Sequence, residues 1–539
     1  MWDRRPAGRR RAFQDASQAF LKTVAQPCSK RTLESALGLG AVAFILFAAL
    51  APNALETGDA ATYAQSIATG NLGETTIHLG YYLLGIVVTP LIPLPADRSL
   101  NIVSAACGGL SVLSIFLIAH LISGKKHVAL VATLLLLTHD MFIRHALYAE
   151  VYLPQTSFLL LAILLWLRNR PILTGAAFAM SVLITPSAVF AVPCLVILRP
   201  QRRALSLMGL TAAALLVIAI LPNYQDFFFG PRNLLRASRA AFSPIHALNK
   251  EGVELLFGFF ASLPLITCGI VAAAVRPRFR VPGLAVASLW LVSLLLGERF
   301  TDVPVQLPTY AVLCLLGGLG FSLLPALPRK RRWARLLPLL ALLSSAAVVL
   351  LIRCSARGAY VAANLPLSVV ATVVVLALPL VMLSGRSRPP RRQRILSVAA
   401  VVAAAAVLNT WIIYARGLER RNDVVAFRDT VMEMHRIADP DYVAISEWSR
   451  GILFEHYVFG RSYTDHWINM EWLRGEWGEQ RQSESAQTLR RAVDAGTELW
   501  LFRPYPELET VLVDRGYRIE PYRTLLRATL HNSEPTNDR

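Results

Sequence analysis

The sequence has little charge for its length. Only 17% of its 539 residues are charged and 55% are hydrophobic, whereas a typical soluble protein devotes about a quarter of its residues to charge. The hydrophobic residues are concentrated in long runs with few interruptions. This composition excludes an ordinary soluble enzyme and indicates a polytopic α-helical membrane protein.

Cysteine is also scarce. The chain has six cysteines and none beyond residue 354. There is no CxxC pair and no His/Cys cluster of the kind that holds zinc. The polar C-terminal part therefore has no disulfide framework, and the sequence predicts no structural metal site.

Acidic residues are outnumbered, 35 to 54, so the formal net charge is +19. The arginines lie in short clusters between apolar runs, as they do in the cytoplasmic loops of membrane proteins. A nucleic-acid-binding protein would instead gather them on one surface. We therefore expect membrane lipids, and no nucleic acid, as partners.

The apolar runs predict about 13 transmembrane spans. The segment 172–198 is too long for one straight crossing. Because Pro186 disfavours helix at the residue before it, we expect two short helices joined by a turn there. The expected single spans are 35–51, 100–122, 128–142, 151–167, 205–221, 253–275, 281–296, 310–324, 336–352, 365–383 and 395–414.

The basic loops determine the expected orientation. They fall on one side of the membrane, together with the arginines of the N-terminal tail, only if segment 79–95 does not cross. We therefore interpret 79–95 as a re-entrant or surface-lying helix inside a first external loop, residues 52–97. The expected domains are a basic cytoplasmic tail (1–34), a transmembrane domain (35–415) and an extracytoplasmic C-terminal domain (416–539).

The C-terminal segment differs in composition from the rest. It is polar and rich in tryptophan and tyrosine, with apolar strands expected at 442–446 and 498–502. Helices are expected at 424–437 and 487–495. This alternation predicts a small α/β domain.

The first external loop carries the strongest candidate for chemistry, Asp59, which follows Gly58 and precedes an expected helix. Tyr63 lies four residues later on the same helical face. The alternative is that Asp59 only caps the helix, a position that aspartate favours. His78 and Tyr81 open segment 79–95, where tyrosines could alternatively serve as interfacial anchors.

The second external loop supplies Asp140, Arg144 and Glu150. Glu150 begins a span, where the helix dipole alone would favour a carboxylate. A carboxylate at a membrane boundary is nevertheless a functional candidate.

A third group of candidates consists of Arg232, Arg236 and Arg239, which recur at helical spacing in an external loop. Arginine binds phosphate through paired hydrogen bonds. The alternative is a solvated helix face without a ligand.

Four short motifs occur along the first half of the chain: Gly58-Asp59, His78-x-Gly80-Tyr81, Arg98-x-x-Asn101 and Ala149-Glu150-Val151-Tyr152. Together they resemble those of the GT-C glycosyltransferases, and within them the bacterial protein O-mannosyltransferase-like branch. The prolines of that branch's His-Pro-Pro-Gly-Tyr motif are missing from this chain.

The resemblance implies transfer of a sugar, mannose or a similar hexose or pentose, from a polyprenyl-phosphate donor to an acceptor hydroxyl. The acceptor would be a protein, glycan or lipid on the extracytoplasmic side of a bacterial plasma membrane, and the anomeric carbon would be inverted. No cofactor is certain, and the resemblance leaves a divalent metal, Mg²⁺ or Mn²⁺, open.

The same resemblance implies roles for individual residues. Asp59 would be the catalytic base, and Glu150 would be the second acidic residue of the catalytic site. His78 and Tyr81 would line the substrate cavity. We add Tyr63, Asp140 and Arg144 as substrate-binding candidates, and we infer that the Arg232, Arg236 and Arg239 face holds the donor phosphate.

Two other classes compete with this interpretation, a transporter or lipid flippase and a non-catalytic cell-envelope assembly protein. Transporters place charges inside their spans and often contain inverted repeats. Here the spans are nearly free of charge and no repeat is evident, so the glycosyltransferase hypothesis is favoured.

Overall fold

The computed structural model describes residues 28–69, 78–137, 140–220, 277–295, 307–321, 414–460 without 416, 466–475 and 479–530, and the single residues Phe20, Val24 and Ala273. The chain divides into two compact units. The first contains Met1–Leu50, Thr76–Leu84 and Ile102–Gly417. The second contains Ala51–Thr75, Gly85–Asn101 and Leu418–Arg539.

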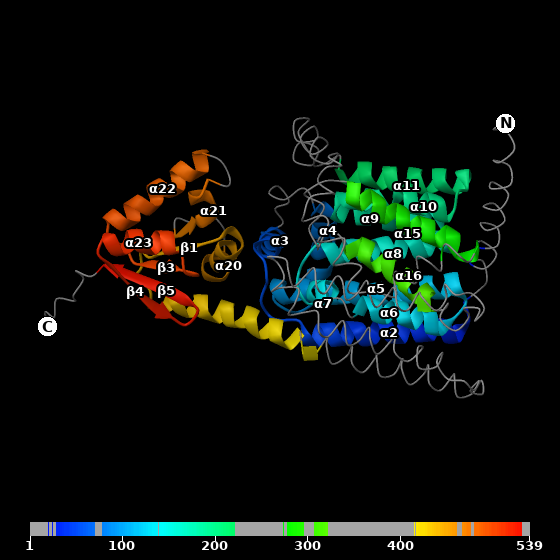
Figure 1. Ribbon diagram of the computed structural model, residues 1–539, viewed down its shortest axis with the longest axis horizontal. Helices are drawn as coiled ribbons and strands as arrows, with labels where there is room; N and C mark the ends of the chain where they lie inside the picture. The colour runs from blue at the N-terminus through cyan, green and yellow to red at the C-terminus, as the bar shows by residue number, and fades with distance from the viewer. Residues whose placement is uncertain are drawn as a thin grey trace, which may run out of the picture. The chain divides into compact units, whose positions relative to one another are not determined.

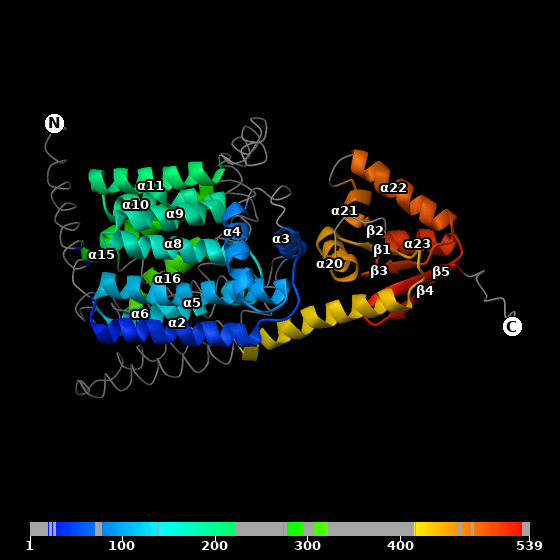
Figure 2. The same cartoon turned by 180° about the vertical axis from the view of Figure 1, so that it is seen from behind.

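The described part of the first unit is helical, and α2, α5, α6, α8, α9 and α11 run alongside one another (Figures 1 and 2). Its helices are α2 (Lys30–Leu50), α4 (Leu79–Val88, extending into the second unit), α5 (Ala96–Ser123, which begins in the second unit), α6 (Lys126–Leu137), α7 (Asp140–Leu147), α8 (Tyr152–Leu167), α9 (Pro171–Ile184), α10 (Val192–Leu198), α11 (Arg202–Ile220), α15 (Pro277–Leu295) and α16 (Leu307–Phe321).

Among the described residues, three helices are long and apolar enough to cross a membrane, or four if the bent pair in 126–147 is one span. They are Lys30–Leu50, Ala96–Ser123 and Arg202–Ala219. The spans expected at 336–352 and 365–383 lie outside the described residues, and those at 253–275 and 395–414 do so except at Ala273 and Tyr414. The total of about 13 spans therefore stays a prediction.

The break expected in segment 172–198 is confirmed. Helix α9 ends at Ile184, and Thr185 is extended, with φ −151° and ψ 122°. A short 3₁₀ helix, η3 (Pro186–Ala191), then leads into α10. The chain turns where the ring of Pro186 restricts the residue before it.

Helix α4 is short, with ten residues followed by the 3₁₀ turn η2 (Thr89–Leu91). Ten residues of helix span roughly 15 Å, about half of the hydrocarbon core of a bilayer. This length agrees with the expectation that segment 79–95 does not cross the membrane.

Small residues bring the helices of the first unit close together. A Cβ added to Gly109 of α5 would lie 2.7 Å from the carbonyl oxygen of Gly40 in α2. Helices α5 and α8 are joined by a buried hydrogen bond between the hydroxyls of Ser111 and Ser157, 2.7 Å apart. Close backbone approach and interhelical hydroxyl contacts are typical of helix packing inside membranes.

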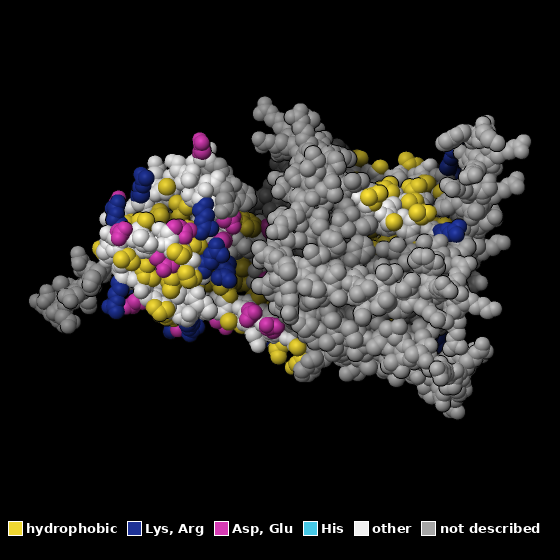
Figure 3. Space-filling view, in the orientation of Figure 1, with side chains coloured by type: hydrophobic (Ala, Val, Ile, Leu, Met, Phe, Trp, Pro, Cys, Tyr) yellow, Lys and Arg dark blue, Asp and Glu magenta, His cyan; other side chains and the backbone are white. Residues whose placement is uncertain are grey.

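Helix α11 keeps an apolar face uncovered. Its side chains Leu207, Leu210, Val217 and Ile218 are 41–69% exposed. Apolar atoms gather at the surface over this helix in Figure 3, whereas the described surface of the C-terminal segment mixes acidic, basic and apolar side chains. Such an apolar face suits contact with lipid.

The C-terminal segment of the second unit folds around a five-stranded sheet with the order β2-β1-β3-β5-β4. The first three strands are parallel, and β5 and β4 form an antiparallel hairpin. The strands are β1 (Val443–Ser446), β2 (Trp467–Asn469), β3 (Leu499–Leu501), β4 (Tyr517–Tyr522) and β5 (Leu525–Leu530). The helices are residues 417–437, of which 417 belongs to the first unit, α20 (Trp448–Phe459), α21 (Met470–Leu473), α22 (Glu479–Asp494) and α23 (Pro506–Asp514).

Both strands expected from the sequence are present as β1 and β3, and they lie next to each other in register. All residues of both strands are buried, because each has neighbours on both edges and apolar side chains on both faces. The same unit also contains residues 52–75 and 85–97 of the expected first loop. The domain boundary at 416 and the placement outside the membrane stay predictions.

Candidate functional site

Asp59 lies in the first turn of helix α3 (Gly58–Thr69) and its side chain is exposed. The helix is capped by the residue before Gly58: the Thr57 hydroxyl accepts the amide hydrogen of Ala60, at 3.2 Å. The alternative that Asp59 is the N-cap is therefore wrong. Its carboxylate gains from the helix dipole but is not used to close the helix end.

The protein around Asp59 removes part of the water that would solvate a carboxylate, although the side chain itself reaches solvent. This desolvation raises the pKa of the Asp59 carboxyl above its ordinary value. A carboxylate with a raised pKa is a stronger base than a fully hydrated one, which is the property that proton removal from a hydroxyl requires.

Helix α20 of the C-terminal segment holds the start of α3. The amide of Gly58 donates to the Ser449 hydroxyl at 3.0 Å. The Tyr457 hydroxyl accepts from the Leu55 amide at 2.5 Å and donates to the Leu55 carbonyl at 3.2 Å. A Cβ added to Gly58 would lie 3.0 Å from the Cα of Ser449, so a side chain at this position would push the two helices slightly apart.

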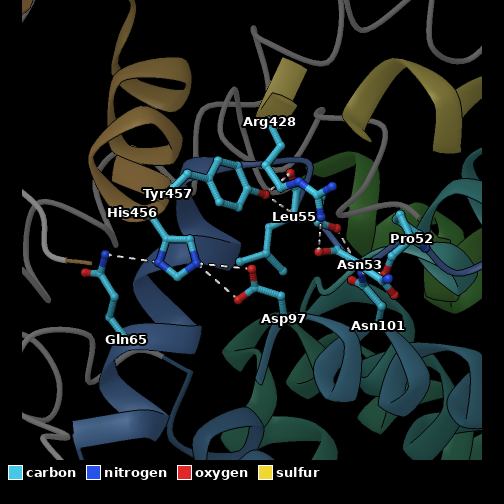
Figure 4. A network of polar contacts seen from close by, with 10 residues as sticks. Pro52, Asn53, Leu55, Gln65, Asp97, Asn101, Arg428, His456 and Tyr457 are labelled. Carbon is cyan, nitrogen blue, oxygen red and sulfur yellow. Dashed lines mark hydrogen bonds and ion pairs between the residues drawn. The ribbon is translucent and has the colours of Figure 1, made fainter. Parts of the chain in front are cut away.

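His456 of α20 joins two parts of the expected first loop (Figure 4). Its Nε2 lies 3.1 and 3.2 Å from the two carboxylate oxygens of Asp97, and its Nδ1 lies 3.3 Å from the Gln65 amide nitrogen. With the proton on Nε2, the ring donates to Asp97 and accepts from Gln65. One imidazole thus connects the far end of α3 with the first turn of α5.

The segment before α3 is fixed by further contacts, several of which Figure 4 draws. The Asn101 side-chain amide donates to the carbonyls of Pro52 and Ala54, at 3.0 and 2.9 Å. The Arg428 guanidinium donates to the carbonyl of Asn53 at 3.2 Å. Asn101 of the motif Arg98-x-x-Asn101 therefore stabilises the backbone that leads to Asp59.

In the first unit, the structure brings Tyr81 and Glu150 together. Both side chains are buried, with 0% and 7% exposure, and the charge of Glu150 acts on the Tyr81 hydroxyl. A carboxylate with so little exposure is costly unless polar groups surround it. The two residues that the resemblance assigns to one site thus share one environment.

Gly80 and His78 fix the start of α4 against the end of α9. A Cβ on Gly80 would lie 2.8 Å from the backbone nitrogen of Ile184. The Nδ1 of His78 donates to the Ile184 carbonyl at 2.7 Å. Burial lowers the pKa of His78 and the hydrogen bond opposes this shift in part, so the ring is neutral near pH 7.

The remaining candidates are less informative. Tyr63 is 3% exposed, Arg144 in α7 is half-buried, and Asp140 is the first residue of α7. Arg232, Arg236 and Arg239 lie outside the described residues. Asp59 and Tyr63 belong to the second unit, and His78, Tyr81, Asp140, Arg144 and Glu150 to the first.

Within the described part of the chain, no three His, Cys, Asp or Glu side chains gather closely enough to hold a metal ion. Among the candidate residues, the groups best suited to chemistry are the carboxylates of Asp59 and Glu150 and the hydroxyl of Tyr81. They suit proton removal and hydrogen bonding to a polar substrate.

The chain resembles solved structures over nearly its whole length. ArnT from Cupriavidus metallidurans bound to undecaprenyl phosphate has a TM-score of 0.58 and 12% identity, covering 92% of this chain and 97% of that chain. ArnT in the apo state has the same TM-score and identity, with 91% and 97% coverage. The chain has the ArnT fold. This fold agrees with the polytopic helical architecture expected from the resemblance, and the mannosyltransferase branch stays a prediction.

No protein-family model and no curated protein matches the sequence. The likeness to ArnT is therefore one of fold, because 12% identity carries no residue-level correspondence. The sequence motifs were enough to indicate this fold. They gave no sign of Ser449, His456 or Tyr457, which lie more than 350 residues after the loop that they contact.

Proposed function

We propose that this protein is a membrane glycosyltransferase that moves a sugar from a polyprenyl-phosphate donor to an acceptor hydroxyl. One observation carries the proposal: the fold matches ArnT over nearly the full length of both chains, and ArnT has been seen with undecaprenyl phosphate bound. A chain with the same helical architecture is expected to hold the same kind of lipid.

The chemistry follows from Asp59. Its carboxylate accepts the proton of the acceptor hydroxyl as the acceptor oxygen attacks the anomeric carbon of the sugar. A bond forms between that oxygen and that carbon, and the bond from the carbon to the phosphate oxygen breaks. Its electron pair leaves with polyprenyl phosphate, which is already an anion and needs no general acid. Attack from the face opposite the leaving group inverts the anomeric carbon.

Glu150 and Tyr81 would supply the polar wall of the sugar site. A buried carboxylate and a buried phenol can orient sugar hydroxyls through hydrogen bonds, and such groups discriminate well because they are costly to leave unpaired. Arg232, Arg236 and Arg239 remain our candidates for the donor phosphate, on the chemistry of arginine alone.

The sugar is proposed only as a hexose or pentose, mannose among them, and the acceptor as a protein, glycan or lipid hydroxyl. We place the reaction on the extracytoplasmic side of a bacterial plasma membrane, with the N-terminus inside and the C-terminus outside. The clustering of basic residues in the opposite set of loops supports this orientation.

The proposal can be tested with the purified full-length chain in lipid nanodiscs. Undecaprenyl phosphate carrying a radiolabelled hexose or pentose is supplied together with an extract of bacterial envelope as acceptor. We expect one donor to be consumed, with free undecaprenyl phosphate released in equal amount. The same chain is also reconstituted in liposomes, where donor movement across the membrane without any donor cleavage would instead identify a flippase and contradict the proposal.

A further inference from the structure

Two helices that are almost 400 residues apart in the sequence pair along two turns. Gly58 and Gln65 of α3 are seven residues apart, and so are their partners on α20, Ser449 and His456. A spacing of seven returns to the same face of a helix. The contacts Gly58–Ser449 and Gln65–His456 therefore make one matched stripe, in which the helices run in the same direction.

Helix α20 is itself fixed on the sheet. Gly451 lies so close to the indole of Trp467 in β2 that an added Cβ would overlap its ring atoms. The Trp467 indole N–H donates to the Ser446 hydroxyl at the end of β1, at 3.0 Å. Two adjacent strands thus fix the position of α20. The stripe of contacts then fixes α3 relative to α20.

The stripe determines where Asp59 points. A single contact would leave α3 able to rotate about its axis or slide along α20, whereas contacts at both ends of a seven-residue interval prevent both movements. Asp59 is the neighbour of Gly58, the first residue of the stripe. A displacement of about 1 Å at a reacting group can reduce a rate about a hundredfold.

We infer that Ser449 and His456 are positioning residues for the Asp59 carboxylate, and that the C-terminal segment is part of the catalytic apparatus because it holds them. This inference rests on the proposed function. Asp97 takes part through His456, because its carboxylate accepts from the ring whose other nitrogen faces Gln65.

The test uses the full-length chain with the changes Ser449→Ala, His456→Ala and His456→Gln. The control is Ser483→Ala, on the exposed face of α22. Loss of one positioning hydrogen bond should lower kcat about tenfold and leave KM within about twofold. His456→Gln should recover most of the loss seen with His456→Ala, because the glutamine amide can still donate to Asp97.

A second readout needs no activity. Hydrogen exchange of the peptide covering 57–69 should become about tenfold faster in Ser449→Ala and His456→Ala and stay unchanged in Ser483→Ala. Unchanged exchange together with unchanged kcat in both alanine variants would overturn the inference. If the wild-type chain consumes no donor while exchange responds as expected, the proposed function fails and the mechanical link between α20 and α3 stands.

Discussion

The amide of Gly58 and the hydroxyl of Ser449 are 3.0 Å apart, which places a residue of the C-terminal segment at the first turn of the helix that carries Asp59. The first N–H groups of a helix have no partner inside the helix. Here one is satisfied by Thr57 and another by Ser449. Neither contact uses the carboxylate of Asp59, so that group is not needed to cap the helix.

The pH dependence of transfer should reflect the raised pKa of Asp59. A general base must be ionised, so kcat/KM should rise with pH through a midpoint above the ordinary aspartate value of about 3.9. The measurement is a pH profile of donor consumption at low donor concentration. A rate that is flat down to the ordinary aspartate pKa would contradict the role of Asp59 as a desolvated base.

The same shift predicts an effect on stability. A carboxyl whose pKa is higher in the folded than in the unfolded protein favours folding at low pH, and that contribution is lost as pH rises through the two values. Asp59→Asn should therefore unfold at a higher temperature than wild type at pH 7, with the difference shrinking at acidic pH. Thermal unfolding in detergent at two pH values checks this, and a destabilised variant at pH 7 would contradict it.

Gly80 should not tolerate a side chain. The change Gly80→Ala places a Cβ against the backbone of Leu183 and Ile184, so α4 must move away from the end of α9. We expect a loss of about 2 kcal/mol in stability. The matched control is Gly209→Ala in α11, where nothing lies within 4 Å of the added Cβ and alanine should stabilise the helix by up to about 1 kcal/mol. Equal effects of the two changes on thermal stability would refute the packing argument.

Replacing Glu150 should lower the rate of sugar transfer without unfolding the protein. Glu150→Gln keeps the size of the side chain and one accepting oxygen, but it replaces the other oxygen with a donating NH2 group and removes the charge that acts on Tyr81. We expect kcat to fall about a hundredfold with little change in melting temperature. Tyr81→Phe, measured in parallel, should lower kcat in the same direction. Wild-type kinetics in Glu150→Gln would exclude it from the site.

The orientation can be checked by cysteine labelling in a cysteine-free background. Asn53 and Lys126 are both exposed, and the hydrogen bond at Asn53 uses only its backbone carbonyl. A membrane-impermeant thiol reagent added outside intact cells should label a cysteine at 53 and not one at 126. The opposite pattern would invert the topology and place Asp59 on the wrong side of the membrane for an external reaction.

Local patterns in the sequence predicted several elements of the described structure. The Pro186 break and strands β1 and β3 follow from proline sterics, β-propensity and hydrophobic patterning, which act within a few residues. The pairing of α3 with α20 does not. It depends on a glycine, a serine and a histidine that are ordinary in their own segments and become informative only once the fold brings positions 58 and 449 together.

The N-cap of α3 shows that prediction from the sequence is also limited between neighbouring residues. Both Thr57 and Asp59 are favoured at a helix start, and the sequence alone does not determine which of them closes it. The structure assigns the cap to Thr57 because the helix begins at Gly58. That assignment removes the simplest non-catalytic explanation for an aspartate at position 59.

The most direct test of the account is sugar transfer by Asp59→Asn compared with Asp494→Asn. Asp494 is an exposed aspartate of α22 in the same unit, so both changes remove one surface carboxylate from the same unit. With a polyprenyl-phosphate sugar that the wild-type chain consumes, Asp59→Asn should lower kcat by at least about a thousandfold while Asp494→Asn keeps the wild-type rate. Full activity in a correctly inserted Asp59→Asn variant would contradict the central claim.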